Sequence, residues 1–240
     1  MKGSDGVDGG NEAAGFRGDK LGLRLTVGRT EMFFSSAAAG DFAGPQPRAV
    51  DTLEALSGIT SDHWAQDDQP HGSRVNLVTT EDVIAPFSNP ADGQVSDRDD
   101  LICAVRTADC LAVLIAGTKA FGAVHAGWRG LSEGVLAAAV TQIRELDDGP
   151  LVAAIGPGAR GCCYEVDDDL RATFAEYPQA QEQPNTLDLA VIASEQLAEL
   201  GIAERYDCGI CTICSRPQEY FSYRRDDGET GRMIGAVWLN

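Results

Sequence analysis

Apolar residues alternate with polar ones near the start of the chain and form continuous runs near its centre. The alternation over residues 21–27 predicts a half-buried strand, and Met32 to Phe34 begins a second strand. Three later runs, residues 101–106, 111–116 and 121–125, are almost wholly apolar, which is typical of strands covered on both faces. The pattern therefore predicts a sheet-rich core built around these runs.

A helical spacing of apolar residues appears between the strands. Residues 131–146 place apolar side chains three to four positions apart, which predicts an amphipathic helix. We expect shorter helices over residues 48–56, 167–177 and 189–200, further strands over 74–79, 151–155 and 233–239, and loops over 37–47 and 86–100. Strands and helices alternate without strict order, so we expect an α/β (α+β) fold with mixed β-sheets flanked by helices.

Length and composition favour one domain. The 240 residues are 43% hydrophobic, enough to bury a full core. Residues 1–20 are rich in Gly, Asp and Glu and offer almost nothing to bury, so we expect a disordered N-terminal tail there. A single folded domain is then expected over residues 21–240.

The charge of the chain excludes several classes of partner. A net charge of −18 argues against binding nucleic acid or an anionic membrane surface, which requires clustered Lys and Arg. No run approaches the ~18 to 20 apolar residues that span a bilayer, and the start of the chain lacks a signal-peptide pattern. We therefore expect a cytoplasmic protein. Its seven cysteines, an odd number, indicate thiols or ligands rather than a disulfide framework.

The central runs carry the candidate chemistry. Cys110 precedes one of them, His125 ends another, and His71 lies upstream beside Gly72. Thiolate and imidazole are the usual ligands of zinc, and three protein ligands are typical of a catalytic zinc site. The same residues are also compatible with a metal-free cysteine–histidine dyad, because a neighbouring imidazolium lowers the pKa of a thiol. A buried cysteine and a strand-end histidine without catalytic roles are the third interpretation.

A second group of cysteines invites a separate metal hypothesis. Cys208, Cys211 and Cys214 are spaced three residues apart, and Cys162 or Cys163 could supply a fourth ligand to zinc or an iron–sulfur cluster. The spacing fits no standard cluster pattern well. Burial in the core, which is common for cysteine, is therefore the alternative that we favour.

Four arginines flank the candidate loops. The guanidinium groups of Arg106 and Arg129 suit phosphate or carboxylate ligands. Arg224 and Arg225 lie beside Asp226 and Asp227, so surface ion pairs are expected for them.

Four ordered motifs stand out between about Gln69 and the C-terminus: Arg106–Cys110 (RTADC), His125–Gly130 (HAGWRG), Ala154–Pro157 followed by Cys162–Val166 (AIGP, CCYEV), and Phe221–Met233 (FSYRRDDGETGRM). Together they resemble the laccase-domain family, whose members are called multicopper polyphenol oxidase, purine nucleoside phosphorylase or peptidoglycan editing factor.

The resemblance implies a single domain related in fold to the catalytic domain of cytotoxic necrotizing factor. It implies one zinc, with copper as the alternative metal, held by His71, Cys110 and His125. The implied activity is phosphorolysis of adenosine, inosine or methylthioadenosine to free base and sugar 1-phosphate, with adenosine deamination beside it. His71, Cys110, His125 and Asp109 are then the expected catalytic residues, and Arg106 and Arg129 the expected contacts to a purine nucleoside and phosphate. We expect a monomer or a homodimer.

One segment departs from the family pattern. Members usually carry Thr-Arg-x-Gly-Gly-Val-Ser near the N-terminus, whereas residues 33–41 read FFSSAAAGD and lack the arginine and the glycine pair. Three alternative functions remain open. A cysteine-dependent amidase in peptidoglycan precursor editing uses the dyad, and a non-enzymatic binding role fits the altered segment. Copper-dependent polyphenol oxidation normally requires several coppers held by histidines, of which the chain has three.

Overall fold

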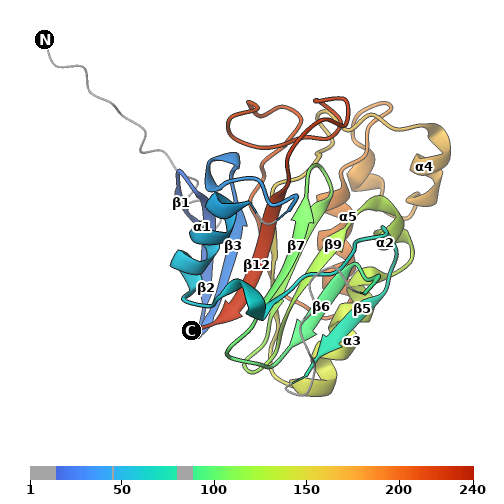
Figure 1. Ribbon diagram of the computed structural model, residues 1–240. Coiled ribbons are helices and arrows are strands. Elements are labelled where there is room, and N and C mark those ends of the chain that lie inside the picture. Colours follow the sequence, from blue (N-terminus) through green and yellow to red (C-terminus); the bar gives the residue numbers. More distant parts are fainter. Residues whose placement is uncertain (1–14, 45, 80–88) are drawn as a thin grey trace, which may run out of the picture.

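Two six-stranded mixed sheets pack face to face in the computed structural model, which describes residues 15–44, 46–79 and 89–240 (Figure 1). The first sheet has the order β1 (Arg17–Asp19), β2 (Gly22–Val27), β3 (Thr30–Ser35), β12 (Met233–Leu239), β7 (Ile102–Thr107) and β4 (Trp64–Ala65). The second has the order β11 (Glu204–Asp207), β10 (Val152–Ile155), β8 (Leu111–Ala116), β9 (Phe121–Ala126), β6 (Gly93–Ser96) and β5 (Val75–Val78). The predicted mixed α+β architecture is confirmed.

Helices cover the two outer faces (Figure 1). Helix α1 (Pro47–Ser57) packs Ala49 and Leu53 against the outer face of the first sheet. Helices α3 (Val135–Leu146) and α5 (Leu189–Glu199) pack on the outer face of the second. The short helix α2 (Trp128–Ser132) joins this layer through the buried Leu131, and the short helix α4 (Asp168–Thr173) contains no fully buried residue. Within the described part of the chain, no helix is both long and apolar enough to cross a membrane.

Strand β8 explains why the central run is continuously apolar. Its side chains alternate between two cores: Val113 and Ile115 pack toward the helices, whereas Ala112 and Leu114 pack between the sheets. The sheets approach closely here, because a Cβ added at Gly235 of β12 would lie 2.4 Å from Cβ of Ala112. Both faces of β8 are therefore buried, as the sequence predicted.

Two predicted elements need correction. The helix expected over residues 131–146 is two helices, because Gly134 has a left-handed φ of 84° that separates α2 from α3. The loop expected over residues 86–100 contains strand β6, which pairs with β5 and β9. Its sequence GQVS is too polar to predict a buried strand, and only pairing with two neighbours buries it. Residues 86–88 of that loop lie outside the described residues.

Part of the segment predicted as a disordered tail belongs to the folded domain. Phe16 is 1% exposed, and its ring lies 6.0 Å from that of Phe34. Strand β1 then pairs with β2, so residues 16–19 belong to the fold because Phe16 completes the core. Residues 1–14 lie outside the described residues. Strands β4 and β11 were not expected from the sequence, since both are short edge strands with little periodicity.

Candidate functional site

His71, Cys110 and His125 converge at one end of the two sheets. Their donor atoms all lie within 4.8 Å of one another. Cys110 immediately precedes β8 and His125 lies near the end of β9, where Ala112 pairs with His125. His71 comes from the loop before β5. Adjacent antiparallel strands thus bring together a thiol and an imidazole that are 15 positions apart in the sequence.

Asp92 fixes the relative position of the two histidines. Its carboxylate is 0% exposed and accepts hydrogen bonds from Nδ1 of His125 at 2.8 Å, the backbone N–H of His71 at 3.0 Å and that of Gly72 at 2.6 Å. The imidazole rings of the two histidines lie 4.8 Å apart and are nearly perpendicular. His71 adopts a left-handed φ of 65°, a conformation that the paired N–H groups of His71 and Gly72 on one carboxylate help to hold.

Gly127 leaves the space that the cluster needs. A Cβ at this position would lie 3.1 Å from Sγ of Cys110 and 3.5 Å from Cδ2 of His71. Its φ of −79° is accessible to any residue, so the requirement is one of space rather than of backbone conformation.

The cluster is strongly coupled electrostatically. Burial disfavours the thiolate of Cys110, but the positive charge of His125 and hydrogen bonds from His125 and His71 outweigh it and lower the pKa to about 6. Burial likewise disfavours protonated His125, but the Cys110 thiolate and Asp92 raise its pKa to about 9. Both shifts favour the imidazolium–thiolate form of the pair.

The donor set fits one transition-metal ion. One thiolate and two imidazoles are ligands that zinc accepts, and three protein ligands leave a position for substrate. Nδ1 of His125 is engaged by Asp92, which leaves Nε2 for the metal, and this carboxylate–imidazole arrangement is common behind metal-bound histidines.

An open pocket of about 640 Å³ lies over the cluster and is lined by basic and aromatic side chains. Burial and the charge of Arg232 both lower the pKa of Arg106, although Asp68 opposes them, so two cations face the same space. Such a site favours an anion. Other basic or aromatic side chains of the lining are Trp128, Arg129, Tyr164, Tyr223 and Arg224.

Asp109 connects the pocket to two further loops. One carboxylate oxygen accepts from the Thr212 hydroxyl at 2.6 Å, and the other from the backbone N–H of Arg224 at 2.6 Å. Its carbonyl accepts from the N–H of Ala159 at 2.7 Å. Asp109 also has a positive φ of 90°. The residue lies in the pocket wall, and its carboxylate is occupied with holding neighbouring loops.

The arginines divide differently from the expectation. Arg225 forms the expected ion pair with Asp226 at 2.7 Å and also donates to carbonyls of nearby loops. Arg224 instead lies over the ring of Tyr164, with its guanidinium carbon 5.2 Å from the ring centroid. Arg232 also lines the pocket, although the sequence analysis did not select it. Its position in the last motif, Phe221–Met233, could have indicated it.

The segment that departs from the family pattern, residues 33–41, contacts the pocket lining through Asp41, and Ala43 just after it lines the pocket. Asp41 accepts from the backbone N–H of Arg232 at 2.7 Å, and Nη1 of Arg106 donates to the carbonyl of Ala43 at 3.3 Å. His63, the remaining histidine, lies elsewhere and pairs with Asp100 at 3.1 Å, with 39% of its side chain exposed. It takes no part in the cluster.

The fold and the cluster define a single-domain α+β protein with a histidine–cysteine–histidine site under an arginine-lined pocket. Residues 26–240 match the family model described as multi-copper polyphenol oxidoreductase laccase. The chain belongs to this family.

Relatives with curated names support the same assignment. The chain is 35% identical over 214 residues to a purine nucleoside phosphorylase of Streptomyces coelicolor, covering 84% of this chain and 87% of the relative. It is 36% identical over 183 residues to the purine nucleoside phosphorylase YfiH of Shigella flexneri, covering 72% of each. Both of these relatives carry the name purine nucleoside phosphorylase, and this chain is similar to them over most of its length.

Solved structures share the fold. YlmD from Geobacillus stearothermophilus superposes with a TM-score of 0.78 at 25% identity, covering 95% of this chain and 99% of that one. Neisseria meningitidis protein NMB0706 gives a TM-score of 0.78 at 27% identity, covering 92% and 99%. The two-sheet architecture is therefore that of the family.

Proposed function

We propose that the protein is a zinc-dependent purine nucleoside phosphorylase that cleaves adenosine, inosine or methylthioadenosine, with adenosine deamination as a second activity. The observation that carries the proposal is the position of the His71, Cys110 and His125 donors at the base of a pocket lined by Arg106 and Arg232. A site for a metal and a site for an anion thus adjoin one another.

The reaction has simple requirements. The bond between the sugar C1′ and the purine nitrogen breaks, a bond between C1′ and a phosphate oxygen forms, and the base leaves with one proton. Phosphate must be held close to C1′, and the purine must be oriented away from it. Bound zinc would supply Lewis-acid chemistry at the three-residue cluster.

The pocket offers groups for each part of the substrates. Arg106 and Arg232 would bind phosphate, because guanidinium groups donate paired hydrogen bonds to its oxygens. Trp128 and Tyr164 present rings that can stack on a purine, and Arg129 and Arg224 each lie over one of them. Asp109 acts as a positioning residue, since its contacts hold the loops that carry Ala159, Thr212 and Arg224.

The test is incubation of purified, zinc-loaded protein with inosine or adenosine, with and without inorganic phosphate. We expect free base and sugar 1-phosphate only when phosphate is present, and inosine from adenosine if deamination also occurs. Base release that does not depend on phosphate would indicate a hydrolase. No release at full zinc occupancy would reject the proposal.

A second candidate function rests on the lowered pKa of Cys110 beside His125. These two residues would form the dyad of a cysteine amidase acting on a peptide or peptidoglycan precursor. Elemental analysis separates the two proposals. Stoichiometric zinc that is lost in Cys110→Ala counts against a free nucleophile, whereas metal-free protein with amidase activity supports it. If the analysis finds copper instead of zinc, it would support the alternative function of phenol oxidation.

A further inference from the structure

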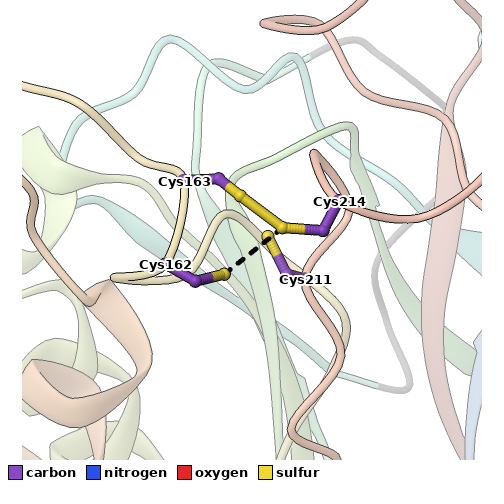
Figure 2. Close-up of side chains that lie close together, drawn as sticks. All are labelled: Cys162, Cys163, Cys211 and Cys214. Carbon is purple, nitrogen blue, oxygen red and sulfur yellow. Dashed lines mark hydrogen bonds between the residues drawn. A yellow bond between two sulfur atoms is a disulfide. The ribbon is translucent and has the colours of Figure 1, made fainter.

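A second cluster of sulfur atoms lies outside the pocket. Sγ of Cys162, Cys163, Cys211 and Cys214 all lie within 4.8 Å of one another (Figure 2). The first two follow β10 and the last two follow β11, so two separate loops each contribute a pair of thiols. Cys208, which the sequence spacing placed with Cys211 and Cys214, is buried among the apolar residues between the sheets instead.

The backbone brings these loops together without help from the sulfurs. The N–H of Gly158 donates to the carbonyl of Ile210 at 3.2 Å, and the N–H of Thr212 donates back to the carbonyl of Gly158 at 3.0 Å. Arg160 adds a 2.7 Å ion pair to Asp207 at the end of β11. The four thiols therefore converge because of the fold, as they do in a preformed metal site.

The sulfurs are paired in one redox state of the cluster. Cys163 and Cys214 form a disulfide, and Sγ of Cys162 lies 3.4 Å from Sγ of Cys214 (Figure 2). Cys162 and Cys211 remain as thiols beside it. A dithiol reductant would convert the disulfide to two thiols, itself becoming a disulfide, which makes four thiols available at one point.

We propose that the reduced cluster binds one zinc ion through the thiolates of Cys162, Cys163, Cys211 and Cys214. Four thiols release four protons and supply all four ligands of a tetrahedral structural site. With Zn–S bonds of about 2.3 Å, a regular tetrahedron separates its sulfurs by roughly 3.8 Å. The existing cluster, confined within 4.8 Å, requires only small side-chain movements to reach it.

The position of the site gives it a structural role next to the pocket. Tyr164, which follows Cys163, lines the pocket, and Thr212, which follows Cys211, donates to Asp109 at 2.6 Å. A metal that ties the two cysteine pairs together would therefore connect a loop that lines the pocket through Tyr164 with a loop that contacts the lining residue Asp109 through Thr212. It is a site distinct from the His71, Cys110 and His125 cluster and shares no ligand with it.

Zinc analysis of full-length protein tests the proposal. The protein is purified anaerobically in a dithiol reductant, equilibrated with zinc and freed of loosely bound metal. We expect two zinc ions per chain in the wild type and one in the double variant Cys162→Ser/Cys211→Ser. Cys110→Ala should also retain one, at the four-cysteine site. If the proposed zinc of the pocket is absent, the wild type holds a single zinc that depends on Cys162 and Cys211, so the two proposals fail separately.

Cys208→Ala is the matched control, because it belongs to the same sequence spacing but lies outside the cluster. It should retain both zinc ions. Replacing zinc by cobalt in Cys110→Ala gives a second readout, and the intense sulfur-to-cobalt absorption of a four-thiolate site is expected. The proposal is overturned if the reduced wild type has four titratable thiols at this cluster but binds no zinc that depends on them. The cluster would then be only a site of disulfide formation. Iron in place of zinc overturns it as well.

Discussion

Asp92 and His125 form a buried ion pair in which the carboxylate lies 2.8 Å from Nδ1 of the imidazole. The same carboxylate accepts the backbone N–H of His71, so one acid orients both histidines of the cluster. Asp92 immediately precedes β6, a strand that the sequence did not predict. The geometry of the candidate metal site therefore depends on a residue outside the three ligands.

Removing the negative charge of Asp92 should weaken metal binding. Asp92→Asn retains the size of the side chain but holds His125 less well and lowers its basicity, so we expect zinc affinity to fall about 10- to 100-fold. Competition with a chromogenic chelator measures the change. Asp97→Asn, an exposed acid on the same segment, is the control and should bind zinc as the wild type does. Equal affinity in both variants would contradict the role of Asp92.

Gly127→Ala should distort the cluster without straining the backbone. The added Cβ would lie 3.1 Å from Sγ of Cys110, so the thiol or β9 must shift by a few tenths of an ångström. We expect lower zinc affinity and lower phosphorolysis, with a small change in melting temperature. Gly134→Ala, whose added Cβ meets nothing within 4 Å, is a control for space alone: it should lose stability through its positive φ and keep zinc.

Arg106→Ala should mainly raise KM for phosphate. Loss of one charged hydrogen-bond donor to a bound anion costs about 1.5 to 3 kcal/mol, which corresponds to roughly 10- to 150-fold. Initial rates against phosphate concentration measure it, with KM for inosine followed in parallel. Arg144→Ala, on the exposed side of α3, should leave both constants unchanged. If the variant raises KM for inosine and leaves KM for phosphate unchanged, phosphate binds elsewhere in the pocket.

Asp109→Asn should separate positioning from direct catalysis. Asparagine tolerates the positive φ, but its amide has one acceptor oxygen where two donors, from Thr212 and Arg224, are now satisfied. We expect unfolding free energy to fall by about 1 to 3 kcal/mol, with a decrease in kcat that Thr212→Val partly reproduces. If kcat falls by orders of magnitude while stability and Thr212→Val are unaffected, Asp109 acts on the substrate directly.

Ionisation of Asp147 should make the free energy of unfolding depend on pH in the acid range. Burial disfavours its ionised form, but hydrogen bonds from Gly149, Lys119, Thr118 and Ala120 outweigh burial and lower the pKa to about 2. The stabilisation is therefore complete above the pKa of the unfolded state, about 3.9, and is lost as pH falls toward 2. We expect Asp147→Asn to cost about 2 kcal/mol at pH 7 and progressively less below pH 4, in urea unfolding at each pH. A cost that is constant with pH would contradict this cause.

Local patterns predicted most of the strands. A period of two near residues 21–27 and the continuous runs at 111–116 and 121–125 report which faces are buried, and this depends only on neighbouring residues in the chain. Local patterns did not predict the strand GQVS, because only its partner strands bury it. They did not predict the break at Gly134, because it is a single residue within a helical pattern.

The sequence by itself determined the chemistry available to the site, because residue types and motifs are enough to select His71, Cys110, His125, Arg106 and Arg129. Only the tertiary structure decided how the remaining polar residues combine. It placed Asp92 in contact with both histidines and brought Arg232 into the pocket. It also formed the second cysteine cluster from Cys162, Cys163, Cys211 and Cys214, without Cys208. These contacts join residues far apart in the sequence, and local periodicity carries no information about such pairs.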